Sequence, residues 1–202
     1  MVVHIIDIET TGFNNVKDDI LEVGYIRCDG KCKILGHGTL YFYRDSFAVE
    51  SQAQQVHGLT RDFLKQYEGE FTMNLAALYT LMSGAIVVGK NNISFDDPFI
   101  QKFLEKYLVG VPVAVPQGEV DVQKTHIEHF RKWYEEKNGC KPPSQKRGSL
   151  SEYIESIGYT QEQVQELYQE MLGETDRAQA HGALYDAFMT YLVFAYDACH
   201  RE

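Results

Sequence analysis

The feature that most constrains the fold is a set of acidic residues in three widely separated segments. Asp7 and Glu9 follow an apolar run near the start, Asp96 stands mid-chain, and Asp186 comes five residues after His181. Carboxylates held close together repel one another and are costly to remove from water unless a cation neutralises them. We interpret these five residues as one metal site, around which the chain has to bring all three segments together.

The first two acids lie at the end of a predicted buried strand. Val2 to Ile8 is apolar and rich in β-branched residues, and residues i and i+2 of a strand point to the same side. Asp7 and Glu9 therefore share a face, where their oxygen atoms suit Mg²⁺ or Mn²⁺ better than zinc. The alternative is that both acids end the strand in solvent. The turn that follows offers backbone N–H groups and hydroxyls to a phosphate or sugar through Thr10, Thr11 and Gly12.

The third acid falls in the first turn of a predicted helix. The capping-box-like segment Ser94 to Asp97 begins this helix, which continues over Pro98 to Tyr107. An acid at this position also interacts well with the helix dipole, which is the structural alternative for Asp96 and for its neighbour Asp97. The local pattern that selects Asp96 includes three further residues, Asn92, Phe95 and Phe99.

The last acid lies on a long amphipathic helix. From Ala180 onwards, apolar residues repeat at intervals of three and four. At about 100° per residue, His181 would point about 140° away from Asp186 if both belonged to one regular helix. We therefore predict that His181 lies at the helix entrance or just before it, where its imidazole could take a proton from water. The alternative is an ordinary surface or capping histidine.

These motifs, in this order, resemble the DEDDh family of 3′-to-5′ exonucleases. The pattern runs Asp-x-Glu-Thr, Asn-x-x-Phe-Asp and His-x-x-x-x-Asp, and the intervening VHGLT at 56–60 matches a motif commonly found in the family. The resemblance extends from His4 to about Tyr196. The nearest subgroup is the proofreading exonuclease of bacterial replicative DNA polymerase, because HGLTRDFL and AHGALYDA are similar to its segments. One departure is Asn91, which stands where many members have His.

The resemblance implies a role for each matching residue. Two divalent cations, Mg²⁺ or Mn²⁺, would bind Asp7, Glu9, Asp96 and Asp186, and His181 would be the general base. The turn after Glu9 would contact the terminal nucleotide. Further contacts to it would come from His57, Gly58, Leu59, Asn92 and Phe95. Two alternatives stay open for the leucine of VHGLT, which is either a wedge against the last bases or a core side chain after the glycine turn.

The reaction that the resemblance implies is hydrolysis of the terminal phosphodiester at a 3′ end, which releases nucleoside 5′-monophosphates. The implied partners are single-stranded DNA or RNA 3′ ends, with a polymerase or another nucleic-acid-processing protein as a holder of the strand. Two other hypotheses stay open: an RNA exonuclease, which would recognise the 2′-OH, and a catalytically silent interaction domain. Intact acids and an intact histidine argue against the silent domain.

The order of predicted elements favours one α/β domain over residues 1–202. The resemblance implies a ribonuclease-H-like fold, with a mixed central sheet, an antiparallel hairpin edge and helices on both sides. Predicted strands are Val2–Ile8, Ile20–Cys28, Lys33–Tyr43, Ala85–Val88 and Glu119–Asp121. The predicted helices before the C-terminal one are Arg61–Gln66, Asn74–Met82, Pro98–Tyr107, Gln123–Lys137, Leu150–Ser156 and Gln161–Met171.

Charge and composition limit the classes of protein to consider. Acidic residues outnumber basic ones 29 to 19, for a net charge of −10, so tight nonspecific binding to duplex is not expected. The basic stretch Lys137 to Arg147 is either a solubilising surface loop or a guide for the strand. No apolar run approaches membrane-spanning length and the start lacks the features of a signal peptide, so we expect a cytoplasmic protein without membrane contact.

Overall fold

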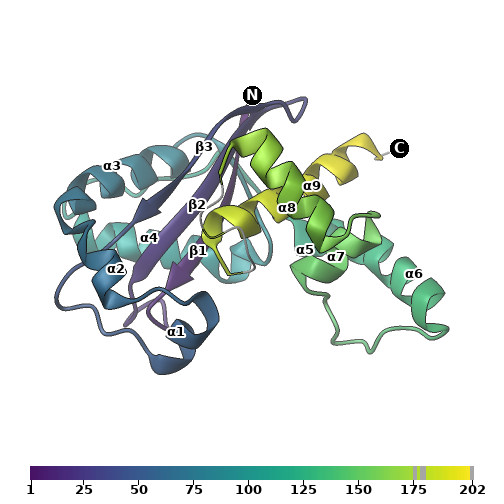
Figure 1. Cartoon of the computed structure of the whole chain (residues 1–202). Coiled ribbons are helices and arrows are strands. Elements are labelled where there is room, and N and C mark those ends of the chain that lie inside the picture. Colours follow the sequence, from purple (N-terminus) through teal and green to yellow (C-terminus); the bar gives the residue numbers. More distant parts are fainter. Residues whose placement is uncertain (175–176, 178–180, 201–202) are drawn as a thin grey trace.

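The computed structural model describes residues 1–174, 177 and 181–200, which form a mixed five-stranded sheet with helices around it (Figure 1). The strands lie in the order β3-β2-β1-β4-β5. β2 pairs antiparallel with β1 and β3, whereas β1, β4 and β5 run parallel. This architecture confirms the predicted ribonuclease-H-like α/β fold. The strands are β1 (Val2–Thr10), β2 (Ile20–Asp29), β3 (Ile34–Tyr41), β4 (Ile86–Gly89) and β5 (Gly118–Asp121).

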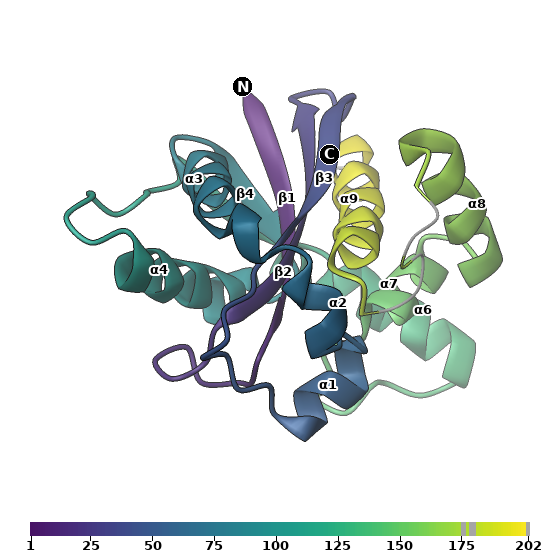
Figure 2. The same cartoon turned by 60° about the vertical axis from the view of Figure 1, so that its left-hand side comes forward.

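Helices cover both faces of the sheet (Figure 2). α3 and α4 lie on one side, and α9 lies on the other, in contact with β1, β2, α7 and α8. The helices are α1 (Ser51–His57), α2 (Arg61–Lys65), α3 (Phe71–Met82), α4 (Asp96–Tyr107), α5 (Val122–Thr125), α6 (Ile127–Asn138), α7 (Leu150–Ser156), α8 (Gln161–Leu172) and α9 (Ala183–Cys199). Two short 3₁₀ helices are η1 (Glu68–Glu70) and η2 (Asn92–Ser94).

The two faces of β1 decide where the predicted metal site lies. Ile6 and Ile8 belong to the core cluster that includes α3 and α4, whereas Ile5 belongs to the cluster that includes α9. A strand buried on both faces explains why apolar residues stand at both even and odd positions of β1. Because side chains alternate along a strand, Asp7 and Glu9 continue the face that carries Ile5. Both acids therefore lie on the side of the sheet that α9 covers.

Several helices differ from the sequence prediction. The predicted helix 123–137 is divided into α5 and α6, which meet at His126. The buried ring of His126 lies 2.7 Å from Asp197 Oδ1 and 2.9 Å from Ser156 Oγ, so contacts with α9 and α7 hold the chain at the break. α1 is a helix that the sequence analysis missed, and it ends at Gly58, which has a φ of 70°.

The C-terminal helix begins later than its apolar pattern suggested. α9 starts at Ala183, and Ala180 lies outside the described residues. Among the helices of the described ranges, none is long and apolar enough to cross a membrane.

Candidate active site

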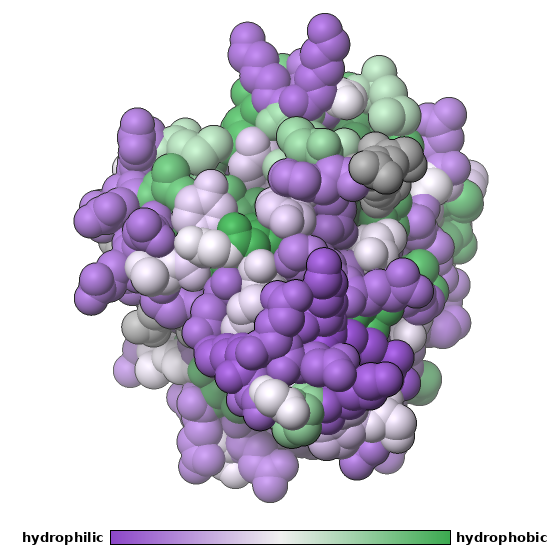
Figure 3. All heavy atoms as spheres, turned by 90° about the vertical axis from the view of Figure 1, so that its right-hand side faces the viewer, coloured by the Kyte–Doolittle hydropathy of each residue, from purple (hydrophilic) through white to green (hydrophobic). Residues whose placement is uncertain are grey.

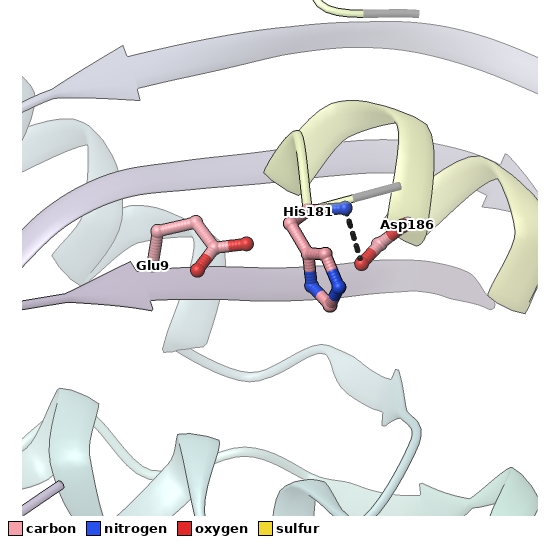
Figure 4. A group of neighbouring side chains, drawn as sticks. All are labelled: Glu9, His181 and Asp186. Carbon is pink, nitrogen blue, oxygen red and sulfur yellow. Dashed lines mark hydrogen bonds between the residues drawn. The ribbon is translucent and has the colours of Figure 1, made fainter. Parts of the chain in front are cut away.

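Three of the predicted site residues come together where β1 ends beside the first turn of α9 (Figure 4). One ligand atom from each of Glu9, His181 and Asp186 lies within 4.8 Å of the other two, so one cation could contact all three. Glu9 comes from β1, Asp186 from the first turn of α9, and His181 from the chain just before that helix. The fold thus joins the first strand to the last helix at this site.

A glycine in β2 allows α9 to lie this close to the sheet. Gly24 pairs with Asp7 in the antiparallel register of β1 and β2. A Cβ atom on Gly24 would lie 2.1 Å from the backbone carbon of Ala183 and 2.1 Å from the backbone nitrogen of Leu184. No side chain fits between two backbones at that separation. Gly24 therefore lets the start of α9 bring Asp186 towards Asp7.

The structure confirms that His181 precedes the helix. Its φ is 66°, in the left-handed region that few non-glycine residues adopt. Its backbone N–H donates to Asp186 Oδ2 at 3.2 Å, the bond drawn in Figure 4. The residue is exposed, and its ring lies between the carboxylates of Glu9 and Asp186. An imidazole in this place can reach a water molecule next to those carboxylates.

Burial, together with the charges of nearby carboxylates, raises the pKa values of the four predicted metal-binding acids. Burial, the largest cause in each case, raises the pKa of Asp7 well above its ordinary range and that of Glu9 to about 9. It raises the pKa values of Asp96 and Asp186 to about 7. For Asp7, the next causes are the charges of Asp186, Asp96 and Glu9. A cation would offset this repulsion, and the carboxylate oxygens are hard ligands of the kind that fits Mg²⁺ or Mn²⁺.

The two adjacent acids of the second motif have different surroundings. Asp96 lies close to the end of β1, because the Ile8 N–H hydrogen-bonds its carboxylate and its charge raises the pKa of Asp7. Asp97 accepts a hydrogen bond of 2.9 Å from Asn92 Nδ2, while burial and then the charge of Glu119 raise its pKa to about 7. Asn92 is 1% exposed and binds Asp97, and its contact with the substrate stays a prediction.

The hydroxyl groups of the turn after β1 hydrogen-bond backbone groups of the same turn. Thr10 Oγ1 donates to the Gly12 carbonyl at 2.6 Å. Thr11 Oγ1 accepts from the Asp19 N–H at 2.9 Å, and the Thr11 N–H donates to the Asp19 carbonyl at 2.8 Å. These bonds fix the turn beside Glu9. In this arrangement the Thr10 hydroxyl and the Thr11 N–H are engaged within the turn, and contact of the turn with a phosphate or sugar stays a prediction.

The VHGLT segment buries two of its side chains, His57 and Leu59, and leaves its other three residues exposed. Leu59 is 1% exposed and belongs to the core cluster that includes α3 and α4, so the core alternative holds and the wedge against the bases is contradicted. His57 Nδ1 accepts the Leu59 N–H at 2.9 Å, and burial lowers the pKa of His57 to about 4. Gly58 ends α1 in the left-handed conformation. Phe95, which was also predicted to contact the nucleotide, is partly exposed. Its ring centroid lies 5.2 Å from that of Phe99.

Three charged residues beside the site were missed in the sequence. Burial lowers the pKa of Lys90, and the charges of Asp7 and other carboxylates oppose that shift. Glu22 pairs with Glu9 across β1 and β2, and Arg177 Nη2 lies 3.0 Å from its carboxylate. An acid inside the apolar run of β2 is the one signal that could have marked Glu22. Lys90 and Arg177 stand in no motif.

The basic stretch Lys137 to Arg147 lies at the end of α6 and in the connection to α7. Figure 3 views this side of the molecule, where hydrophilic side chains gather. Lys137 pairs with Glu155 on α7. A groove beside the stretch is lined by Arg131, Lys132, Glu135, Lys141, Pro142 and Ser144. The stretch is largely exposed, as predicted, and guidance of a strand stays a prediction.

A protein-family model described as exonuclease, RNase_T, matches residues 4–194 of this chain. The chain belongs to this exonuclease family. The match covers both ends of the site, from the acids of β1 to Asp186 of α9. No curated protein matches the sequence.

Solved structures of exonuclease I share the fold of this exonuclease-family chain. E. coli exonuclease I in complex with a dA16 oligonucleotide gives a TM-score of 0.68 at 17% identity, over 96% of this chain and 40% of that one. Exonuclease I from Methylocaldum szegediense gives a TM-score of 0.65 at 19% identity, over 99% of this chain and 41% of that one. A zinc-bound complex of E. coli exonuclease I with single-stranded DNA gives a TM-score of 0.63 at 17% identity, over 96% of this chain and 39% of that one. The chain spans about 40% of the length of these proteins. Likeness to the polymerase proofreading subunit stays a prediction.

Proposed function

We propose that this chain is a metal-dependent 3′-to-5′ exonuclease acting on single-stranded DNA. The observation that carries the proposal is the grouping of Glu9, His181 and Asp186 beside Asp7 and Asp96. Clustered carboxylates destabilise a protein that has no use for them, which argues against a silent interaction domain. The family match, and the oligonucleotide complexes of the structurally similar exonuclease I, support the same activity and substrate.

In this proposal the residues of the site divide the work of hydrolysis. Asp7, Glu9, Asp96 and Asp186 would hold two divalent cations through their carboxylate oxygens. Such cations lower the pKa of the attacking water and stabilise the charge on the leaving 3′ oxygen. His181 accepts the proton of that water. The products are a nucleoside 5′-monophosphate and a strand shortened by one nucleotide, which again ends in a 3′-OH.

The charge of the chain favours a short grip on the end of a strand. With a net charge of −10, the chain has little means of binding along a duplex. We expect single-stranded and frayed 3′ ends to be degraded faster than blunt duplex. Processivity should be low unless a partner such as a polymerase holds the strand. Residues 1–202 form the catalytic domain in this proposal.

The test is digestion of 5′-labelled DNA and RNA oligonucleotides of one sequence with Mg²⁺ or Mn²⁺. We expect a ladder that shortens from the 3′ end, and no cutting of a closed circular single strand. A 3′-phosphate should slow the first cut. Cutting of the circle, or release of the labelled 5′ mononucleotide at the first step, would contradict the exonuclease proposal. Faster digestion of the RNA strand would make RNA the substrate.

Two variants connect the activity with the site. Asp186→Asn should abolish hydrolysis while circular dichroism shows an unchanged fold, because a charged metal ligand is lost. His181→Ala should lower kcat by roughly two to four orders of magnitude, the usual scale of general base catalysis. His181 also lies within ligand distance of Glu9 and Asp186, so calorimetry with Mn²⁺ has to accompany the kinetics. Loss of Mn²⁺ binding, or a normal kcat, would remove His181 from the role of base.

A further inference from the structure

Arg177 connects β2 to the chain segment that carries His181. Its Nη2 atom donates to Glu22 Oε2 at 3.0 Å and to the His181 carbonyl at 2.8 Å. The side chain of Glu22 is 2% exposed and that of Arg177 is 19% exposed, so the pair is largely shielded from water. Shielded, charge-assisted hydrogen bonds hold their partners more firmly than exposed surface ion pairs do.

The same carboxylate also binds the residue that begins α9. The Ala183 N–H donates a hydrogen bond to the Glu22 carboxylate, and this bond lowers the pKa of Glu22. This N–H is one of those that a helix leaves unpaired at its start, and the N-cap residue, Gly182, has no side chain to accept it. Glu22 thus binds the start of α9 directly and the carbonyl of His181 through Arg177.

Both polar backbone groups of His181 are therefore bound. The carbonyl accepts from Arg177, and the N–H donates to Asp186 Oδ2 at 3.2 Å. With a φ of 66°, His181 has a conformation that a non-glycine residue keeps only where its surroundings impose it. The two hydrogen bonds supply that constraint. They also fix the direction in which the imidazole leaves the backbone.

We propose that the Glu22–Arg177 pair is a positioning device for His181, which holds the backbone so that the imidazole faces the carboxylates of the site. The inference rests on the proposed function, in which His181 removes the proton of the attacking water. Arg177 acts through His181 and is a positioning residue. Its removal should therefore impair proton transfer and leave the binding of substrate unchanged.

A double-mutant cycle tests this inference. At saturating Mn²⁺, Arg177→Ala should lower kcat by about tenfold to a hundredfold, the scale of a misplaced catalytic group, with KM for the oligonucleotide unchanged. In the His181→Ala background, the same substitution should have no further effect on kcat, because no imidazole is left to position. A purely structural Arg177 would lower kcat by the same factor in both backgrounds, and that result would overturn the inference. Wild-type kcat in the single Arg177→Ala variant would do the same.

Arg61 provides a matched control. Its Nη2 atom also donates to a carboxylate and a carbonyl, both of Asp45 and both at 3.0 Å, but its side chain is 54% exposed. Arg61→Ala should keep the wild-type kcat, and a loss equal to that of Arg177→Ala would overturn the inference. If the single His181→Ala variant kept the wild-type kcat, the proposal that His181 is the base would be wrong. That result would be known before the cycle is completed.

A second variant covers the case in which Arg177→Ala does not fold. Removing Arg177 leaves Glu22 buried without its cation, which is strongly destabilising. The double substitution Glu22→Gln with Arg177→Met leaves no unpaired charge, keeps the shape of the Glu22 side chain and retains an unbranched apolar stem at residue 177. It should show the same loss of kcat, and the same absence of effect in the His181→Ala background. Wild-type kcat in this folded variant would overturn the inference.

Discussion

Replacing Gly24 with alanine should disturb the geometry of the site without removing a metal ligand. The new Cβ would lie 2.1 Å from the Ala183 backbone, whereas ordinary contacts begin at 3.4 Å. The first turn of α9 therefore has to move away from β2 by about 1.3 Å. Asp186 lies in that turn, so it moves away from Asp7. A displacement of this size costs on the order of 10²-fold in rate, and overpacking costs about 1–3 kcal/mol of unfolding free energy.

The assay measures kcat on a single-stranded oligonucleotide and the Tm of the same preparation. We expect kcat to fall about a hundredfold and Tm to fall by about 2–12 °C for a chain of this length. Gly36→Ala on β3 is the matched control, because a Cβ there meets no atom within 4 Å, and both quantities should stay near wild type. A wild-type kcat in Gly24→Ala would refute the reasoning, since α9 could then withdraw without moving Asp186.

Asp97→Asn should keep most of the activity while Asp96→Asn abolishes it, because Asp96 faces Asp7; equal losses of kcat would show that the choice between the two acids is wrong. The raised carboxylate pKa values stabilise the metal-free protein fully below about pH 4, and this contribution is lost as pH rises through about 7 to 9. In thermal melts, Tm of the metal-free protein should therefore fall over that range while the increase on adding Mn²⁺ grows, and a flat profile would contradict the clustering. If the basic groove guides the strand, Lys141→Glu should raise KM for a long oligonucleotide and lower its salt slope by about one, with kcat/KM on a trinucleotide unchanged. Lys33→Glu, in the β2–β3 hairpin, is the control, and equal behaviour of both variants would identify the stretch as a surface loop.

Periodicity within single elements was enough to find most of the site. Asp7 and Glu9 share a face because alternation is a property of one strand, whatever packs on it. His181 was placed before the helix because five residues on a regular helix would have turned it away from Asp186. The α/β class followed from the order of strands and helices. These conclusions needed no knowledge of which elements become neighbours.

Contacts between distant segments were decided only by the tertiary structure. Asp96 and Asp97 are adjacent acids at the start of one helix. The local pattern favoured Asp96, but only the tertiary structure places it near Asp7, with the Ile8 N–H bound to its carboxylate. Leu59 has the same side chain whether it meets a base or the core, and packing placed it in the core. Arg177 has no motif at all, because its partners lie on β2 and beside α9. The local sequence pattern shows on which face of its own helix or strand a residue lies. The burial and hydrogen-bond partners of that residue depend on which other elements pack against that face.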